Sequence, residues 1–296
     1  MSEPREAKRQ PKAVPIFEGE MPSVSDGIQV NVPVRPNGHS RVDIAINGKV
    51  VDLKDRQKII FLVGRGRLGK TTLAWLLAET ALSAEREVLL GDLVPTEETF
   101  SLARFFPKNT SKPKARNDAE STKRFLSGFV DHVKAHGITT LVDMGGGDTA
   151  FPSLLSELDG LAEALESEGI HPVLLYVAGT SRGDLDPISV VESFGFQPQA
   201  TAIILSEMSR KAGETFDQAF GPIRRQPVYK QLIAREAVEL SIPVLHASVA
   251  GAVEGGLSLY DARDTNQLGG IMARTYARTW INEELRRLKP IESWLP

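Results

Sequence analysis

The chain has 296 residues, of which 41% are hydrophobic and 25% are charged, with a formal net charge of −3 and no cysteine. This length and composition are typical of one large globular α/β domain with short appendages. The lack of cysteine excludes disulfide bonds, thiolate catalysis, cysteine-ligated zinc and iron–sulfur clusters. A net charge near zero argues against binding polyanions through bulk charge.

Residues 1–40 are rich in proline, charge and small polar groups, which predicts a disordered or extended N-terminal arm. Its basic cluster can contact an acidic partner, although a solvated tail is the simpler interpretation. We find neither the apolar core of a secretory signal nor a stretch long enough for a transmembrane helix. The expectation is therefore a cytoplasmic protein.

Residues 41–57 are predicted to form a β-hairpin appendage. Asn47-Gly48 separates two alternating apolar runs, Val42–Ile46 and Lys49–Leu53. Both central positions of a tight hairpin turn need a positive φ, which these two residue types tolerate. We expect the hairpin to pack on the main domain, with a contact to a partner or a second subunit as the alternative.

Residues 58–296 alternate short apolar runs with helical patterns, which predicts a mostly parallel sheet covered by helices on both faces, a three-layer α/β fold. The expected strands are Ile59–Val63, Val88–Gly91, Thr139–Asp143, Val173–Ala178, Thr201–Leu205 and Pro243–Ala247. The expected helices are Thr71–Leu82, Ala119–Ala135, Ser153–Ser167, Leu185–Phe194, Val228–Leu240 and Gln267–Leu288. Between them, Phe106–Asn117 is interpreted as a basic exposed loop.

A glycine-rich motif follows the first of these strands. Gly64, Gly69, Lys70 and Thr71 satisfy G-x-x-x-x-G-K-[ST], the P-loop pattern. Glycines let backbone N–H groups turn toward phosphates, the lysine reaches the β- and γ-phosphates, and the threonine hydroxyl ligates Mg²⁺. The predicted nucleotide-binding segment is Gly64, Arg65, Gly66, Arg67, Leu68, Gly69, Lys70, Thr71 and Thr72. A glycine-rich turn without a ligand is the alternative.

Two carboxylates end neighbouring predicted strands. Asp143 precedes a run of three glycines, and its position suits a metal-shell ligand beside the P-loop, with an ordinary turn as the alternative. Asp92 closes the strand Val88–Gly91 and can orient the attacking water, with a helix N-cap as the alternative. We therefore predict a metal site formed by Thr71, Asp92 and Asp143.

The motif resembles the deviant Walker A of the ParA/MinD group of P-loop ATPases, K-G-G-x-G-K-[ST], over roughly residues 58–288. This resemblance implies catalytic roles for Lys70, Asp92 and Arg65, with Mg²⁺ as cofactor and ATP as substrate. In the family the first lysine reaches the nucleotide of the partner subunit in a homodimer. Here that position is Arg65, which keeps the charge, and the second glycine of the family motif is Arg67.

The base-binding residues are harder to predict. A guanine-specific Asn/Thr-Lys-x-Asp motif is missing after the strand Thr201–Leu205, which favours ATP over GTP. By resemblance Ser206 contacts the base. Ala247-Ser248-Val249 follows the expected last strand, and backbone groups there can line the base, so Ser248 is a further candidate.

Two basic features each have both a functional and a structural interpretation. The last helix carries apolar residues at helical spacing with arginines between them, and docking on the core is favoured over binding a membrane surface. Arg224, Arg225 and Lys230 form a basic cluster in a predicted loop, where the resemblance allows nonspecific DNA binding. A solvated loop is the simpler interpretation. His132 and His136 have metal-like spacing but no apparent third ligand, and we interpret them as structural.

The resemblance thus implies an ATPase whose nucleotide state controls dimerisation and the binding of a protein or DNA partner, in DNA partitioning, mobilisation or positioning. A metabolic ATP-dependent synthetase or kinase on the same fold is the first alternative. A nucleotide-dependent adaptor that does not hydrolyse ATP is the second.

Overall fold

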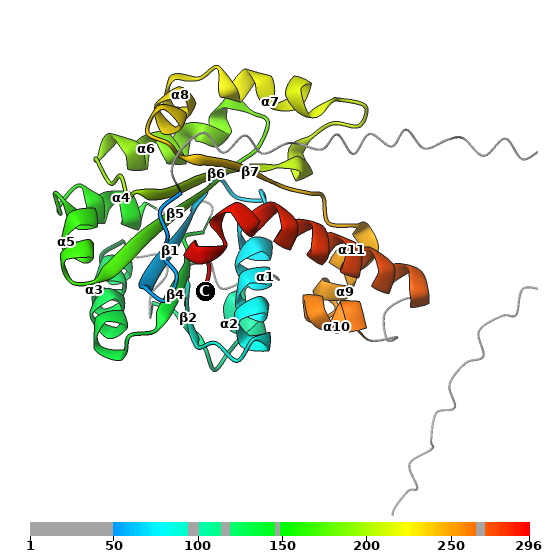
Figure 1. Cartoon of the computed structure of the whole chain (residues 1–296), viewed down its shortest axis with the longest axis horizontal. Helices are drawn as coiled ribbons and strands as arrows, with labels where there is room; N and C mark the ends of the chain where they lie inside the picture. Colours follow the sequence, from blue (N-terminus) through cyan, green and yellow to red (C-terminus); the bar gives the residue numbers. More distant parts are fainter. Residues whose placement is uncertain (1–49, 94–100, 114–118, 146–148, 265–269) are drawn as a thin grey trace, which may run out of the picture. The chain divides into compact units, whose positions relative to one another are not determined.

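A computed structural model describes residues 50–93, 101–113, 119–145, 149–264 and 270–296 (Figure 1). The predicted N-terminal arm and the turn of the predicted hairpin lie outside these residues. Within the described part of the hairpin segment, Val50–Leu53 forms no strand, and Gln57 begins the first strand of the sheet.

Seven parallel strands form one sheet with the order β3-β2-β4-β1-β5-β6-β7. Their bounds are β1 Gln57–Gly64, β2 Val88–Asp92, β3 Thr110–Ser111, β4 Thr139–Asp143, β5 Ile170–Ala178, β6 Ala200–Ser206 and β7 Val238–Ile242. This confirms the predicted α/β class with a parallel central sheet. Because all strands run the same way, their carboxyl ends share one edge of the sheet.

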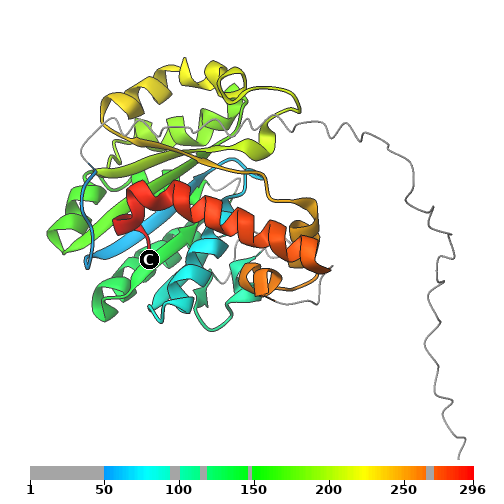
Figure 2. The same cartoon turned by 45° about the vertical axis from the view of Figure 1, so that its right-hand side comes forward.

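Helices cover both faces of the sheet (Figures 1 and 2). Along β1, Ile60 and Leu62 point to one apolar core, while Ile59 and Phe61 point to the other. This alternation follows from the two-residue period of a strand, and the continuous apolar run is what a strand buried on both faces requires.

The first core packs beneath the helices α1 Lys70–Ser83, α2 Leu102–Phe105, α9 Ala247–Glu254, α10 Leu259–Asp264 and α11 Gly270–Leu288, with the short helix η3 Lys289–Trp294. The second packs beneath α3 Ala119–His136, α4 Ala150–Leu155, α5 Leu161–Ser167, α6 Asp186–Ser193, α7 Phe216–Arg224 and α8 Pro227–Ala234. Two further 3₁₀ turns follow strands, η1 Arg182–Leu185 after β5 and η2 Glu207–Ser209 after β6.

The predicted strand Pro243–Ala247 is wrong. The last strand is β7, Val238–Ile242, because the helix expected over Val228–Leu240 ends at Ala234. Glu236 then adopts a left-handed φ of +68°, which a helix cannot continue through. The alternating residues of β7 had been assigned to that helix.

Two further expectations need correction. The helix Ser153–Ser167 is two helices, α4 and α5, separated at Gly160, whose φ is +68°. The loop Phe106–Asn117 contains the short edge strand β3, Thr110–Ser111. The first residues of the predicted last helix, Gln267–Leu288, lie outside the described residues, and from Gly270 to Leu288 the helix is as expected.

The last helix packs on the core, which is the interpretation that the sequence pattern favoured. Ala277, Trp280, Ile281 and Leu288 are buried in the first core. The indole Nε1 of Trp280 donates a hydrogen bond to the carbonyl oxygen of Pro243 at 3.0 Å. Within the described residues, no helix is both long and apolar enough to cross a bilayer.

Candidate functional site

The P-loop connects β1 to α1 at the carboxyl edge of the sheet. Gly64, the last residue of β1, lies so close to β5 that a Cβ there would stand 2.2 Å from the carbonyl oxygen of Val177. Only glycine fits this close approach of two strands. The loop then runs to Gly69, which has a φ of +88° and is the N-cap of α1. The N-terminus of a buried helix therefore opens onto the loop, an arrangement that favours anions.

Lys70, the first residue of α1, is buried, and its ammonium lies inside the loop. Nζ donates a hydrogen bond to the carbonyl oxygen of Arg65 at 2.9 Å. Burial raises the pKa of the nearby Asp143 carboxyl, and the positive charge of Lys70 acts against that rise. The loop thus encloses a cation whose hydrogen-bond partner is a backbone oxygen on the opposite side of the turn.

Thr71 and Asp143 come from different elements and meet beside Lys70. The hydroxyl of Thr71 donates to Asp143 Oδ2 at 2.5 Å, and Gly145 N donates to Oδ1 at 3.4 Å. Asp143 has no solvent exposure. Burial raises the pKa of the Asp143 carboxyl, while Lys70 and the Thr71 hydrogen bond act against that rise. A hydroxyl and a carboxylate side by side are hard oxygen donors of the kind that Mg²⁺ prefers.

Asp92 lies next to this pair but has structural partners of its own. It is the register partner of Asp143 across β2 and β4, and its charge raises the pKa of Asp143. Its Oδ2 accepts hydrogen bonds from the Ser101 hydroxyl and from Ala103 N at 3.1 Å. Ala103 is in the first turn of α2, so Asp92 holds the start of that helix, whose N-cap position is Ser101. Asp92 itself ends β2 and is not an N-cap residue, and its water-orienting role stays a prediction.

The two arginines of the P-loop differ in their surroundings. Arg65 is largely exposed, and its Nη1 lies 3.8 Å from Asp184 Oδ1 in η1. Asp184 is itself held in a capping box with Ser181, whose N–H donates to Oδ2 at 3.0 Å. Arg67 is exposed and has a left-handed φ of +65°. The Ser181-x-x-Asp184 spacing is a capping-box signal that could have pointed to η1 in the sequence.

The two serines predicted for the base lie in unlike places. Ser206 ends β6, is fully buried, and its Oγ has no hydrogen-bond partner among the described residues. Ser248 is in the first turn of α9, separated from β7 by residues 243–246. Its hydroxyl lies 2.7 Å from Nδ1 of His246, whose ring stacks on Tyr276 of α11. The expected position of Ser248 directly after a strand is therefore wrong.

Sequence reasoning missed the η2 residues. Glu207 follows Ser206 at the end of β6 and forms ion pairs with Arg287 at 2.5 Å and with Arg210 at 3.1 Å. Next to it, Met208 lies over the P-loop, because a Cβ on Gly69 would stand 3.0 Å from its Sδ. The segment had been noted only for lacking a guanine motif.

Other candidate clusters are explained by local structure. Arg224 is at the end of α7 rather than in a loop, and it pairs with Asp217 at 2.8 Å and with Glu239. His132 and His136 stack with ring centroids 4.0 Å apart. In the part of the chain that the structure describes, no group of three or more His, Asp or Glu side chains could hold a metal.

A scan against models of known protein families and a search of curated proteins find no match. Solved structures similar to this chain include chloroplast FtsY from Physcomitrella patens, with 16% identity and a TM-score of 0.43 over 67% of this chain and 63% of that one. Another is the signal recognition particle receptor FtsY from Elizabethkingia anophelis in complex with GDP, with 15% identity and a TM-score of 0.42 over 67% and 61%.

A third is the signal recognition particle 54 kDa protein from Aeropyrum pernix K1 in complex with GDP, with 16% identity and a TM-score of 0.42. That match covers 82% of this chain and 51% of the other. This chain thus spans less than two thirds of the length of each of the three. Matches at this level assign no function to it.

Proposed function

We propose that the chain binds and hydrolyses a nucleoside triphosphate, with ATP as substrate and Mg²⁺ as cofactor. The observation that carries this proposal is the pairing of Thr71 with Asp143 at 2.5 Å beside the buried ammonium of Lys70. In a P-loop these three groups serve the metal and the β- and γ-phosphates. They come together here from α1 and β4, 72 residues apart in sequence.

Each residue then has a distinct task. The P-loop N–H groups and Lys70 bind the phosphates, and the ammonium exchanges its bond to the Arg65 carbonyl for phosphate oxygens. Thr71 and Asp143 would hold Mg²⁺, which would neutralise charge on the phosphates. Water attacks the γ-phosphorus in line, the bond to the bridging oxygen breaks, and ADP and phosphate leave. Asp92 orients that water once it is released from Ser101 and α2.

The preference for ATP is supported by the state of Glu207. A carboxylate can distinguish guanine by accepting hydrogen bonds from the N–H groups of the base. The acidic side chain at the carboxyl end of β6 instead has both oxygens in ion pairs, one with Arg287 and one with Arg210. ATP is therefore the substrate we propose, and GTP is the competing outcome of the test.

We further propose that nucleotide state controls dimerisation and partner binding, as the ParA/MinD resemblance implies. Exposed Arg65 supports this, because among the described residues its guanidinium has only an ion pair of 3.8 Å and can turn toward a second subunit. A second candidate, an adaptor that binds ATP without turnover, is favoured by the hydrogen bonds that hold Asp92 to Ser101 and Ala103.

The test measures nucleotide affinity, phosphate release and molecular mass in solution with Mg-ATP, Mg-ADP, Mg-GTP or no nucleotide. Lys70→Ala is expected to lower ATP affinity at least tenfold, because the buried cation is lost. Lys134→Ala, which removes an exposed ion pair on α3, is the matched control and stays within twofold. Asp92→Ala is expected to bind ATP but not to release phosphate. Binding without turnover by the wild-type chain supports the adaptor, and no binding of either nucleotide contradicts the proposal.

A further inference from the structure

The turn η2 touches the P-loop on one side. Met208 lies against Gly69, because a Cβ added to that glycine would stand 3.0 Å from its Sδ, although nearly half of Met208 is exposed. Ser209 Oγ accepts a hydrogen bond from Thr180 N at 3.0 Å, and Thr180 Oγ1 donates to the Ser209 carbonyl at 3.2 Å. The neighbouring Gly179 lies against Leu68 of the P-loop. Thus η2 packs against the loop directly and through the end of β5.

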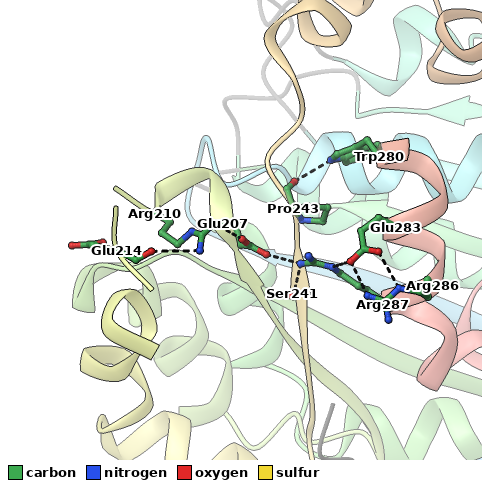
Figure 3. Close-up of polar contacts among 9 residues, drawn as sticks. All are labelled: Glu207, Arg210, Glu214, Ser241, Pro243, Trp280, Glu283, Arg286 and Arg287. Carbon is green, nitrogen blue, oxygen red and sulfur yellow. Dashed lines mark hydrogen bonds and ion pairs between the residues drawn. The ribbon is translucent and has the colours of Figure 1, made fainter. Parts of the chain in front are cut away.

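On its other side η2 is tied to the last helix by Arg287 (Figure 3). Nη1 of Arg287 donates to Glu207 Oε1 at 2.5 Å and to the Ser241 hydroxyl at 2.7 Å, while Nε donates to Glu283 at 2.8 Å. The side chains of Arg287 and Glu207 are only 15% and 11% exposed. Removing one partner of an ion pair this buried strongly destabilises the fold, because the remaining charge is left buried and unpaired. Removing one partner of a surface pair costs little.

We infer that Arg287 is a positioning residue for the nucleotide site: its ion pair with Glu207 fixes η2, and η2 in turn holds Gly69 and Leu68 in the form that binds phosphate. This inference rests on the proposed function for its effect on ATP. The contact chain α11–η2–P-loop exists in the protein without nucleotide and can be tested there as well.

Loss of Arg287 leaves Glu207 with a weaker partner. Its other ion pair is with Arg210, whose side chain is 35% exposed, at 3.1 Å. Without Arg287, this largely buried carboxylate turns toward water to recover hydration. That turn moves Glu207 and the adjoining Met208 away from the P-loop, because the two residues are consecutive in a turn of three.

The helix supplies a matched control at the next position. Arg286 pairs with the same Glu283 at 2.7 Å, but its side chain is 61% exposed at the helix surface. Replacing either arginine by methionine removes one positive charge and keeps much of the apolar stem. Only the Arg287 replacement removes the bond to η2.

The experiment compares Arg287→Met, Arg286→Met, Glu207→Gln and the double variant Glu207→Gln/Arg287→Met. One readout is the affinity for Mg-ATP, and the other is amide hydrogen exchange of Leu68–Lys70 without nucleotide. We expect Arg287→Met and Glu207→Gln each to weaken ATP binding about tenfold and to speed exchange in the loop. We expect Arg286→Met to stay within twofold of wild type, and the double variant to lose no more than the stronger single.

Arg287→Lys separates positioning from general packing. It keeps a charge for Glu207 and should recover most of the affinity and exchange protection lost in Arg287→Met. If Arg287→Met does not fold, Glu207→Gln, which breaks the same ion pair from the other side, takes its place. Equal affinities for Arg286→Met and Arg287→Met, or losses that add in the double variant, would overturn the inference. If the wild-type chain binds no nucleotide, the proposed function fails, and the exchange measurement still decides whether Arg287 controls the loop.

Discussion

Arg67 occupies a backbone position that suits glycine. Its φ is +65°, in the left-handed region that side chains with a Cβ rarely adopt. The motif that this loop resembles has a glycine at the matching position. The arginine adopts the left-handed φ at a cost of about 1–2 kcal/mol.

We predict that Arg67→Gly is more stable than Arg67→Ala by about 1 kcal/mol, because glycine alone adopts this φ without strain. Both variants lose the same exposed guanidinium, so their difference isolates the backbone. Urea unfolding of the two proteins measures it. At Arg65, which does not have a positive φ, the order should reverse, with the alanine variant more stable than the glycine variant. The same order at both positions would contradict the prediction.

Within α11, two consecutive glutamates are held in opposite charge states. Hydrogen bonds from Arg286 lower the pKa of Glu283 to about 2, with Arg287 adding to the effect. Burial raises the pKa of Glu284 to about 8, and neither of its oxygens has a hydrogen-bond partner among the described residues. Glu283 thus belongs to an ion-pair network, whereas Glu284, on the adjoining face of the helix, is an acid that is mainly neutral at pH 7.

This contrast predicts a pH dependence of stability. Because the folded-state pKa of Glu284 lies above its unfolded value of 4.5, its stabilising contribution is complete below pH 4.5 and is lost as pH rises to about 8. Arg287, Glu283 and Glu207 are the charged groups that act on it. Glu284→Gln stays uncharged, so its melting temperature relative to wild type should rise by several degrees between pH 5 and pH 8.

Glu283→Gln is the matched comparison for Glu284→Gln. The lowered pKa of Glu283 makes its contribution present above pH 4.5 and lost as pH falls toward 2. Its replacement should therefore lower the melting temperature modestly at pH 7, since the pair is partly exposed. An unchanged difference between Glu284→Gln and wild type from pH 5 to pH 8 would show that Glu284 is ionised throughout.

At the level of whole elements, the sequence predicts what depends on local pattern. The P-loop, α1 and the strands β1, β2, β4, β5 and β6 follow from apolar runs and from Gly64 to Thr71, and the structure confirms these elements. The error at β7 arose because VELSI fits a helix end as well as a strand. The left-handed backbone at Glu236 excludes a continuous helix, but glutamate is not a residue type that signals such a conformation.

The η2 contacts could not be predicted for a different reason. Glu207 and Arg287 are 80 residues apart, and neither has a pattern that marks its partner. Asp92 is similar, since its place at a strand end was predictable but its hydrogen bonds to Ser101 and Ala103 depend on where α2 lies. Polar partners that are distant in sequence are brought together by the packed fold, so they can be identified only once the fold is known.

At the scale of the whole described domain, hydrogen bonds connect residues near its first residue to residues near its last. Trp294 is buried, and its Nε1 donates to the Val51 carbonyl at 2.7 Å. Beside it, Lys58 Nζ donates to the carbonyls of Leu53 at 3.3 Å and of Ser293 at 3.0 Å. These contacts lie at the start of β1, so they close the amino edge of the sheet, opposite the P-loop.

We predict that Trp294→Ala lowers the free energy of unfolding by about 3–5 kcal/mol, because it removes a large buried ring and leaves a cavity. Leu295→Ala, at a partly buried position next to it, should cost clearly less. Guanidinium unfolding followed by circular dichroism measures both. Nucleotide affinity of the folded Trp294→Ala protein should remain within twofold of wild type, since the P-loop is at the other edge. Similar stability losses for the two variants would show that Trp294 is not the anchor.

The anchoring of η3 at the amino edge of the sheet also determines where the protein can be attached to a support or a probe. Pro296 lines the same hollow as Gln57 and Thr139, the first residues of β1 and β4. A solid support, a dye or a force probe coupled at Glu292, an exposed η3 residue that lines the same hollow, would therefore pull on the amino edge of the sheet. A protein tethered in this way would present the opposite edge, where the P-loop lies, to the surrounding solution.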